Sequence, residues 1–189
     1  MKVKGTAVRV LPDYIKKNYT ELYDLWLEKL PPASYDIFSK PIFASEWFEL
    51  YDSHVVPTRV LADITSSTPE EIARKVGHFS AESALKGVYN IFLKIASMKY
   101  AIQRVPQFFS TYYDPVFVEM VDTSDGNVVI KFGYTKENET LLYNRNTGWI
   151  ERFLELAFKP SNLQVSFELK PDVSKPDLYY ALFNVKWSK

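Results

Sequence analysis

The sequence predicts an α+β fold in which an N-terminal helical lobe packs on a small antiparallel sheet made of two hairpins separated by a helix. Apolar residues recur at helical spacing through most of the first 114 residues, and beyond Pro115 they follow strand patterns that one further helical segment interrupts. No glycine- and serine-rich linker divides the 189 residues. We therefore expect one domain over 1–189, with the helical lobe at about 1–114 and the hairpin–helix–hairpin unit at about 115–189.

The first helices are predicted from their start and stop signals. Pro12 and Asp13 open a helix that ends at Pro31 and Pro32. Ser45 is a candidate N-cap for a second helix, which would contain Phe48 and Tyr51. Pro57 interrupts that helix, and the apolar period resumes from Val60 to Ile64.

The clearest helix start is Thr68-Pro69-Glu70-Glu71, which combines a capping hydroxyl, proline at the first helical position and an early glutamate. The period after it extends to about Ser97, with a bend expected near Gly87. A further helix is expected over 100–109.

The second half is predicted to form two hairpins around a helix. Runs at 116–121 and 128–132 are rich in β-branched and aromatic residues and flank the Asp-Gly pair at 125–126, a strong hairpin turn signal. Helical spacing returns over 141–158 and stops at Lys159-Pro160. Strands are expected over 163–169, which alternates cleanly, and over 178–187.

Composition excludes several classes of function. Basic and acidic residues balance at 23 each, so nothing predicts binding to nucleic acid. The absence of cysteine excludes thiolate metal sites and thiol nucleophiles. His54 and His78 lie in different predicted helices without ligand spacing, so we expect no metal site. No glycine-rich phosphate loop or nucleophile elbow occurs, and we expect no enzyme activity.

The compartment is expected to be the cytoplasm. The first twelve residues contain basic residues but only a broken apolar run and no small-residue cleavage site. No stretch approaches the roughly 18 apolar residues of a membrane span.

The aromatic content is the unusual feature, with 13 Phe, 13 Tyr and 4 Trp. Such side chains build ordinary cores, and they also line pockets for apolar ligands. Arg104 interrupts an apolar stretch and is a candidate anchor for a carboxylate or a phenol. The candidate ligand-binding residues are Trp47, Phe48, Tyr51, Phe79, Tyr89, Phe92, Arg104, Phe108 and Tyr112.

Several short motifs, taken in order, resemble an uncharacterised bacterial heme NO-binding-like family. They are Val3-Lys-Gly5, Leu30-Pro-Pro32, Ser45-Glu-Trp47, Gly77-His-Phe-Ser-Ala-Glu82, Gly87-Val-Tyr89, Pro106, Tyr112-Tyr113 and an aromatic-rich closing strand. The wider superfamily includes H-NOX sensors, 4-vinyl reductase domains and TRAPP vesicle-tethering subunits. The resemblance implies helices and a sheet that enclose a cavity for a small, mostly apolar ligand.

The resemblance also implies which cofactors to look for. H-NOX domains hold heme through a proximal histidine and a Tyr-x-Ser-x-Arg motif, yet no histidine lies between Pro106 and Tyr113 and the motif does not occur. The 4-vinyl reductase relatives carry zinc-binding cysteines near the last two strands, where this chain has Glu168, Leu169, Leu178 and Tyr179. We therefore expect no cofactor.

Two functions remain open. The first is a heme-free sensory domain that binds an apolar small molecule or lipid in an aromatic-lined cavity. The alternative is a scaffold of the TRAPP type, which forms a homodimer or binds a signalling partner without a ligand.

Overall fold

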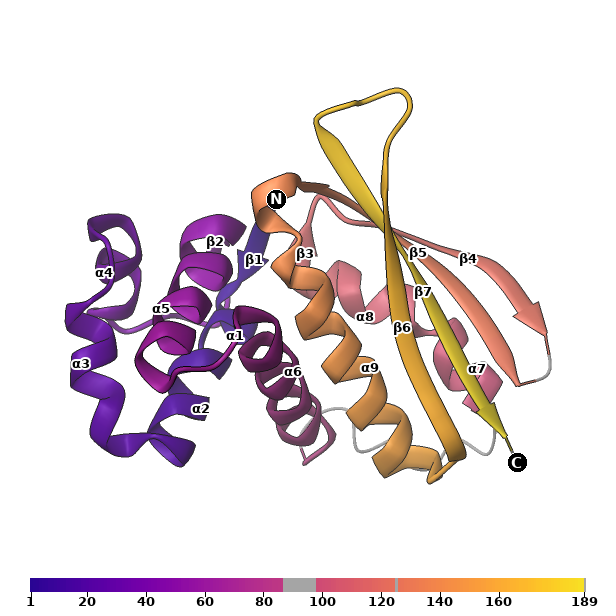
Figure 1. The fold of residues 1–189 in the computed structure, drawn as a ribbon, viewed down its shortest axis with the longest axis horizontal. Coiled ribbons are helices and arrows are strands. Elements are labelled where there is room, and N and C mark those ends of the chain that lie inside the picture. Colours follow the sequence, from indigo (N-terminus) through magenta and orange to yellow (C-terminus); the bar gives the residue numbers. More distant parts are fainter. Residues whose placement is uncertain (87–97, 125, 189) are drawn as a thin grey trace.

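The computed structural model describes residues 1–86, 98–124 and 126–188. It confirms the predicted α+β fold: Figure 1 shows a helical half, a twisted antiparallel sheet, and the long helix α9 (Leu141–Phe158) running between them. Within these ranges, no helix is both long and apolar enough to cross a membrane.

The helical half consists of short helices and two short strands around the long helix α6 (Pro69–Lys86). Before α6, the elements in order are β1 (Lys2–Lys4), α1 (Gly5–Val8), α2 (Val10–Asn18), the 3₁₀ turn η1 (Thr20–Leu22), α3 (Tyr23–Glu28), α4 (Pro32–Phe38), β2 (Trp47–Glu49), the π-helical turn η2 (Tyr51–Val55) and α5 (Val56–Thr65).

Further along the chain come α7 (Met98–Gln103), α8 (Val105–Tyr112), β3 (Tyr113–Asp114), β4 (Phe117–Ser124), β5 (Asn127–Lys136) and the 3₁₀ turn η4 (Glu137–Glu139). Two long strands, β6 (Ser161–Pro171) and β7 (Leu178–Ser188), follow α9. The predictions for 141–158 and for the four strands of the two hairpins are confirmed. Gly126 has φ +76°, as the predicted turn requires, whereas Asp125 lies outside the described residues.

The described strands form two antiparallel sheets. The larger has the order β4-β5-β7-β6, so the two hairpins join through β5 and β7. Alternate residues of β5 and β7 face α8 and α9, among them the buried Phe132 and Phe183. The smaller sheet has the order β2-β1-β3, in which Val3 pairs with both Phe48 and Tyr113.

The helix predicted to begin at Ser45 is wrong over its first residues. Trp47–Glu49 instead forms β2, which pairs with β1 in the register Lys2 to Glu49 and Lys4 to Trp47. The partner strand lies more than forty residues away in the sequence, so a local pattern does not reveal it. Helical structure begins after Leu50, and the π-helical turn η2 leads directly into α5. The interruption expected at Pro57 is therefore wrong: Pro57 lies in the first turn of α5, a position that tolerates proline.

Two other predicted helices are shorter than expected. The helix expected from Pro12 to Leu30 breaks at Tyr19, whose φ of −146° is not helical, and continues as η1 and α3. The helix expected over 100–109 is divided at Arg104 into α7 and α8. Thr68 caps α6 as predicted, because its Oγ1 accepts from the Glu71 N–H at 3.2 Å, while the bend near Gly87 lies outside the described residues.

Helices α6 and α9 pack backbone to backbone at two glycines. A Cβ on Gly148 would clash with the carbonyl oxygen of Arg74, and one on Gly77 would clash with the carbonyl oxygen of Arg145. Neither obstacle is a flexible side chain, so the close approach requires glycine at both positions.

A cluster of polar side chains also joins α6 to α9. Arg74 Nε donates to Glu151 Oε2 at 2.8 Å, Arg74 Nη2 pairs with Oε1, and His78 Nε2 lies 3.0 Å from Oε2. Burial raises the pKa of Glu151, but the hydrogen bonds from His78 and Arg74 outweigh burial and leave the pKa below its ordinary value. Ionised Glu151 therefore stabilises the folded state.

Replacing Glu151 with glutamine is expected to lower the free energy of unfolding by about 1–2 kcal/mol at pH 7, since charge-assisted hydrogen bonds are lost. The folded-state pKa is lowered, so this stabilisation is present above the unfolded value and disappears as the pH falls through the folded value, below about 4.5. Urea unfolding of both proteins at pH 7 and pH 3 measures the difference. Glu155→Gln, a more exposed carboxylate on α9, is the control, and a Glu151→Gln difference equal at both pH values would contradict this account.

Candidate ligand-binding pocket

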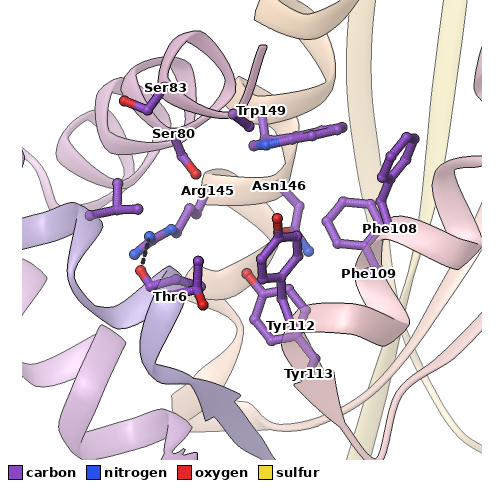
Figure 2. A pocket seen from close by; sticks show the side chains of 13 residues that line it. Thr6, Ser80, Ser83, Phe108, Phe109, Tyr112, Tyr113, Arg145, Asn146 and Trp149 are labelled. Atoms are coloured by element: carbon purple, nitrogen blue, oxygen red, sulfur yellow. Dashed lines mark hydrogen bonds between the residues drawn. The ribbon is translucent and has the colours of Figure 1, made fainter. Parts of the chain in front are cut away.

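A pocket of about 180 Å³ lies where α1, α2, α6, α8 and α9 meet (Figure 2). Thr6, Ala7 and Val10 line it from α1 and α2, and Ser80, Ser83 and Ala84 line it from α6. Thr6 and Ser83 are exposed and mark the side on which the pocket meets solvent.

Aromatic rings form the inner wall of the pocket. Phe108, Phe109, Tyr112 and Tyr113 come from α8 and the start of β3, and Trp149 comes from α9. The ring centroid of Trp149 lies 5.8 Å from the ring centroids of both Phe108 and Phe109. The wall is continuous with the core, because Phe109 contacts Phe132 of β5 edge to face at 5.0 Å.

The polar part of the lining belongs to α9. Arg145 is 5% exposed, and its Nη2 donates to the Ala7 carbonyl at 2.8 Å, at the end of the short helix α1. Asn146 is 1% exposed. Arg145 Nη1 and Asn146 Nδ2 are both buried without a hydrogen-bond partner among the described residues. Asn146 lines this pocket, whereas Arg145 lines both this pocket and a small void beside His54, whose Nε2 is likewise buried without a partner. Unsatisfied buried polar atoms are rare in a folded protein.

The charge of Arg145 affects the titratable groups around it. Burial lowers the pKa of the Arg145 guanidinium, which nevertheless stays charged at neutral pH. Burial raises the pKa of Tyr113, and the charge of Arg145 opposes that shift only partly, so the phenol stays neutral. Burial, together with Arg145, holds the pKa of His54 well below its ordinary value. Neutral His54 then donates from Nδ1 to the Ser53 carbonyl at 3.0 Å and has an acceptor at Nε2.

Two of the residues predicted from the sequence, Phe108 and Tyr112, line the pocket. Trp47 and Phe48 lie in β2, where Trp47 is 40% exposed and the ammonium of Lys4 lies 5.7 Å from its ring. Tyr51 packs against a small separate cluster of Val55, Ala73 and Leu141. The structure thus places these three aromatics away from the pocket lining.

The remaining predicted residues are distributed differently. Phe79 lies on α6 against Tyr14, with ring centroids 5.6 Å apart, and is not among the lining residues. Arg104 is half-buried and uses its guanidinium within the chain, hydrogen-bonding to the Tyr100 hydroxyl and lying 4.9 Å from the Tyr100 ring. Tyr89 and Phe92 lie outside the described residues.

Arg145 and Asn146 were not predicted as site residues from the sequence. A signal exists, because Arg145 precedes Trp149 by four positions and therefore lies on the apolar face predicted for the 141–158 helix. A cation on that face requires either a partner or a function.

The pocket does not fit a heme held by an imidazole, thiolate or thioether ligand. Its described lining contains hydroxyls, phenols, one guanidinium and one amide, but no histidine or methionine. His54 lines a separate void of about 10 Å³, and His78 hydrogen-bonds to Glu151. A volume of 180 Å³ is also below the 300–1,000 Å³ or so typical of sites for large ligands. Over the described residues, no group of three or more His, Asp and Glu side chains forms a metal site.

The fold is α+β, and its small, aromatic-lined pocket lies among α1, α2, α6, α8 and α9, with Tyr113 of β3 completing the lining. Neither a protein-family model nor a curated protein sequence matches the chain.

Solved H-NOX structures share the fold. The Fe(II) unliganded H-NOX protein from K. algicida has a TM-score of 0.71 at 8% identity, covering 98% of this chain and 97% of that chain. The Fe(II)NO form of an H-NOX protein from S. oneidensis has a TM-score of 0.69 at 10% identity, covering 98% and 99%. A mutant H-NOX from T. tengcongensis has a TM-score of 0.63 at 13% identity, covering 98% of each chain. The predicted H-NOX-like fold is confirmed, whereas the relationship to 4-vinyl reductase and TRAPP domains stays a prediction.

Proposed function

We propose that this protein is a heme-free sensory domain that binds a small, mostly apolar molecule in the pocket between α1, α6, α8 and α9. The observation that carries the proposal is the pocket itself. Protein interiors contain few voids larger than a water molecule. Because the pocket opens to solvent beside Thr6 and Ser83, water has access to its apolar wall, and a guest that covers this wall gains the free energy of removing apolar surface from water.

The volume sets the size of the guest. An engineered apolar cavity of roughly 150 Å³ takes up benzene, so a pocket of about 180 Å³ suits a single ring with a small substituent. Trp149, Phe108 and Phe109 offer ring faces and edges to such a guest. A long lipid chain does not fit within the described lining.

The proposal of a heme-free state rests on the lining chemistry. Heme requires an axial ligand, and the chain's two histidines both lie outside the pocket lining. Tyrosine can also ligate heme as the phenolate, but burial raises the pKa of the lining residue Tyr113 and keeps its phenol neutral. An absorbance scan of the purified protein, before and after addition of hemin, is expected to show no Soret band from bound heme. A Soret band that persists through gel filtration would overturn this part of the proposal.

The scaffold alternative rests on the family resemblance alone, and the pocket has no role in it. Catalysis is not proposed either, because the described lining presents no nucleophile with an adjacent base. Binding of a small molecule accounts for both the aromatic wall and the buried polar side chains of the pocket.

Binding is tested with benzyl alcohol, a one-ring probe, through its effect on thermal unfolding. At one hundred times its dissociation constant, a ligand stabilises by about 2.7 kcal/mol, which raises the melting temperature by about 5–10 °C for a chain of this size. Ala84→Phe fills the pocket from α6 and is expected to abolish the shift.

Arg59→Phe is the matched control, because it adds the same ring to an exposed face of α5, outside the pocket lining. It is expected to keep the full ligand-induced shift. Absence of any shift for the unmodified protein, or an equal shift for Ala84→Phe, would contradict the proposed function.

A further inference from the structure

The feature that extends the proposed function is the charge of Arg145. The side chain is 5% exposed, and no carboxylate among the described residues forms a salt bridge with it. Among the described residues, its guanidinium donates to the carbonyl oxygen of Ala7, which is neutral. An isolated buried charge is among the costliest groups in a protein interior, so buried guanidinium groups are normally paired with an anion.

Within 1–86, 98–124 and 126–188, the titratable groups that interact with Arg145 do not supply the missing anion. Tyr113 lies near enough to interact electrostatically, but burial raises the pKa of its phenol and keeps it neutral at pH 7. His54, whose ring centroid lies 6.4 Å from that of Tyr113, is neutral as well, because burial and the charge of Arg145 lower its pKa. The void of about 10 Å³ between His54 and Arg145 has space for about one water, which satisfies a donor but neutralises no charge.

Asn146 adds a second donor on the same wall. Its Nδ2 is buried and unpartnered, and Asn146 lines the large pocket and not the small void. In Figure 2 the Arg145 guanidinium points toward α1, where it meets the Ala7 carbonyl, and the Asn146 amide points toward the side of the pocket formed by α8. A carboxylate has two acceptor oxygens, so a guest lying between these side chains can pair with a cation and a neutral donor.

We propose that the pocket is selective for a small monocarboxylate with an apolar ring or branched body, with the carboxylate at Arg145 and Asn146 and the body against Trp149, Phe108 and Phe109. This inference rests on the proposed function and names its ligand class. A monocarboxylate matches the single positive charge, and its planar group suits the fork of a guanidinium. The small volume and the aromatic inner wall disfavour more highly charged anions such as phosphate.

Calorimetric titration of the whole chain at pH 7 with benzoate and with benzyl alcohol tests the proposal. The two probes share the ring and differ in charge. Benzoate is expected to bind at least tenfold more tightly, a difference of about 1.4 kcal/mol. Acetate, which carries the charge without the ring, is expected to bind more weakly than benzoate.

The variant Arg145→Met is expected to reduce the benzoate to benzyl alcohol affinity ratio to about one, and Arg145→Lys is expected to keep part of the preference. Because Arg145→Met replaces an unpaired buried charge by an apolar side chain of similar length, the thermal stability of the ligand-free protein is expected not to fall. A purely structural Arg145 would show the opposite pattern, a lower stability with an unchanged ratio.

The outcomes separate the two proposals. Binding of neither probe overturns the proposed function and the inference with it. Equal binding of both probes by the unmodified protein leaves the proposed function standing and overturns the inference. Where Arg145→Met fails to fold, Asn146→Leu, which keeps the cation and removes the amide donor, is expected to lower benzoate affinity several-fold and benzyl alcohol affinity less. An equal loss for both probes would also count against the inference.

Discussion

Replacing Gly148 with alanine is expected to lower the free energy of unfolding by about 2–3 kcal/mol, although the same change in an ordinary helix raises helix stability by about 1 kcal/mol. The sign reverses because the added methyl would meet the carbonyl oxygen of Arg74 and the His78 ring. A flexible side chain could change rotamer to make room for the methyl, but the backbone of α6 cannot. The two helices must therefore move apart.

Urea unfolding followed by circular dichroism measures this effect. Asp63→Ala, on the exposed face of α5, is the control and is expected to change stability by less than about 0.5 kcal/mol. Gly77→Ala is expected to be destabilising too, because its Cβ would meet the Arg145 carbonyl. The double variant with alanine at both glycines is expected to lose less stability than the sum of the two single losses, because one methyl already separates the helices. A stabilising Gly148→Ala would show that α6 and α9 do not lie this close.

Replacing Phe132 with alanine is expected to cost about 3–5 kcal/mol. The ring is 1% exposed and contacts Phe109, Tyr113, Tyr143 and Phe183, with centroid separations between 5.0 and 6.3 Å. It therefore joins the sheet to α8, to α9 and to two residues of the pocket wall. The lost stability has two causes: the apolar ring no longer contributes its free energy of transfer from water, and a cavity is left among the four rings.

Phe132→Leu, which keeps most of the volume, is the control and is expected to cost less than half as much. Chemical unfolding gives both values. Because Phe109 and Tyr113 rest on Phe132, the alanine variant is also expected to weaken benzyl alcohol binding, measured below the unfolding transition. Equal costs for the two substitutions would show that the aromatic contacts contribute little beyond apolar volume.

Local patterns predicted the second half of the fold better than the first. The 141–158 helix carries a long apolar face and a clear stop, and its bounds agree with α9. Trp47–Glu49 formed a strand where a helix was expected, because it pairs with β1, a strand at the start of the sequence that a local pattern does not include. The break at Tyr19 has no glycine or proline to mark it.

The candidate site could be predicted only in part from the sequence. Phe108 and Tyr112 line the pocket, but aromatic content does not distinguish them from Trp47 or Phe79, which lie elsewhere. What distinguishes the lining residues is the meeting of α1, α6, α8 and α9, a property of the tertiary structure. Arg145 is marked in the sequence as a cation on the apolar face of the 141–158 helix. This signal is its charge, which aromatic content does not reveal.

The backbone contact between α6 and α9 determines which walls of the pocket can respond to a guest. At Gly77 and Gly148 these two helices have no side-chain layer between them, so they cannot move closer together. We expect adjustment to a guest in α1 and α8 instead, which continue directly from β1 and into β3. Strands β1 and β3 pair at Val3 and Tyr113, and β1 also pairs with β2. A shift of α1 or α8 on ligand binding would therefore tilt the small β2-β1-β3 sheet.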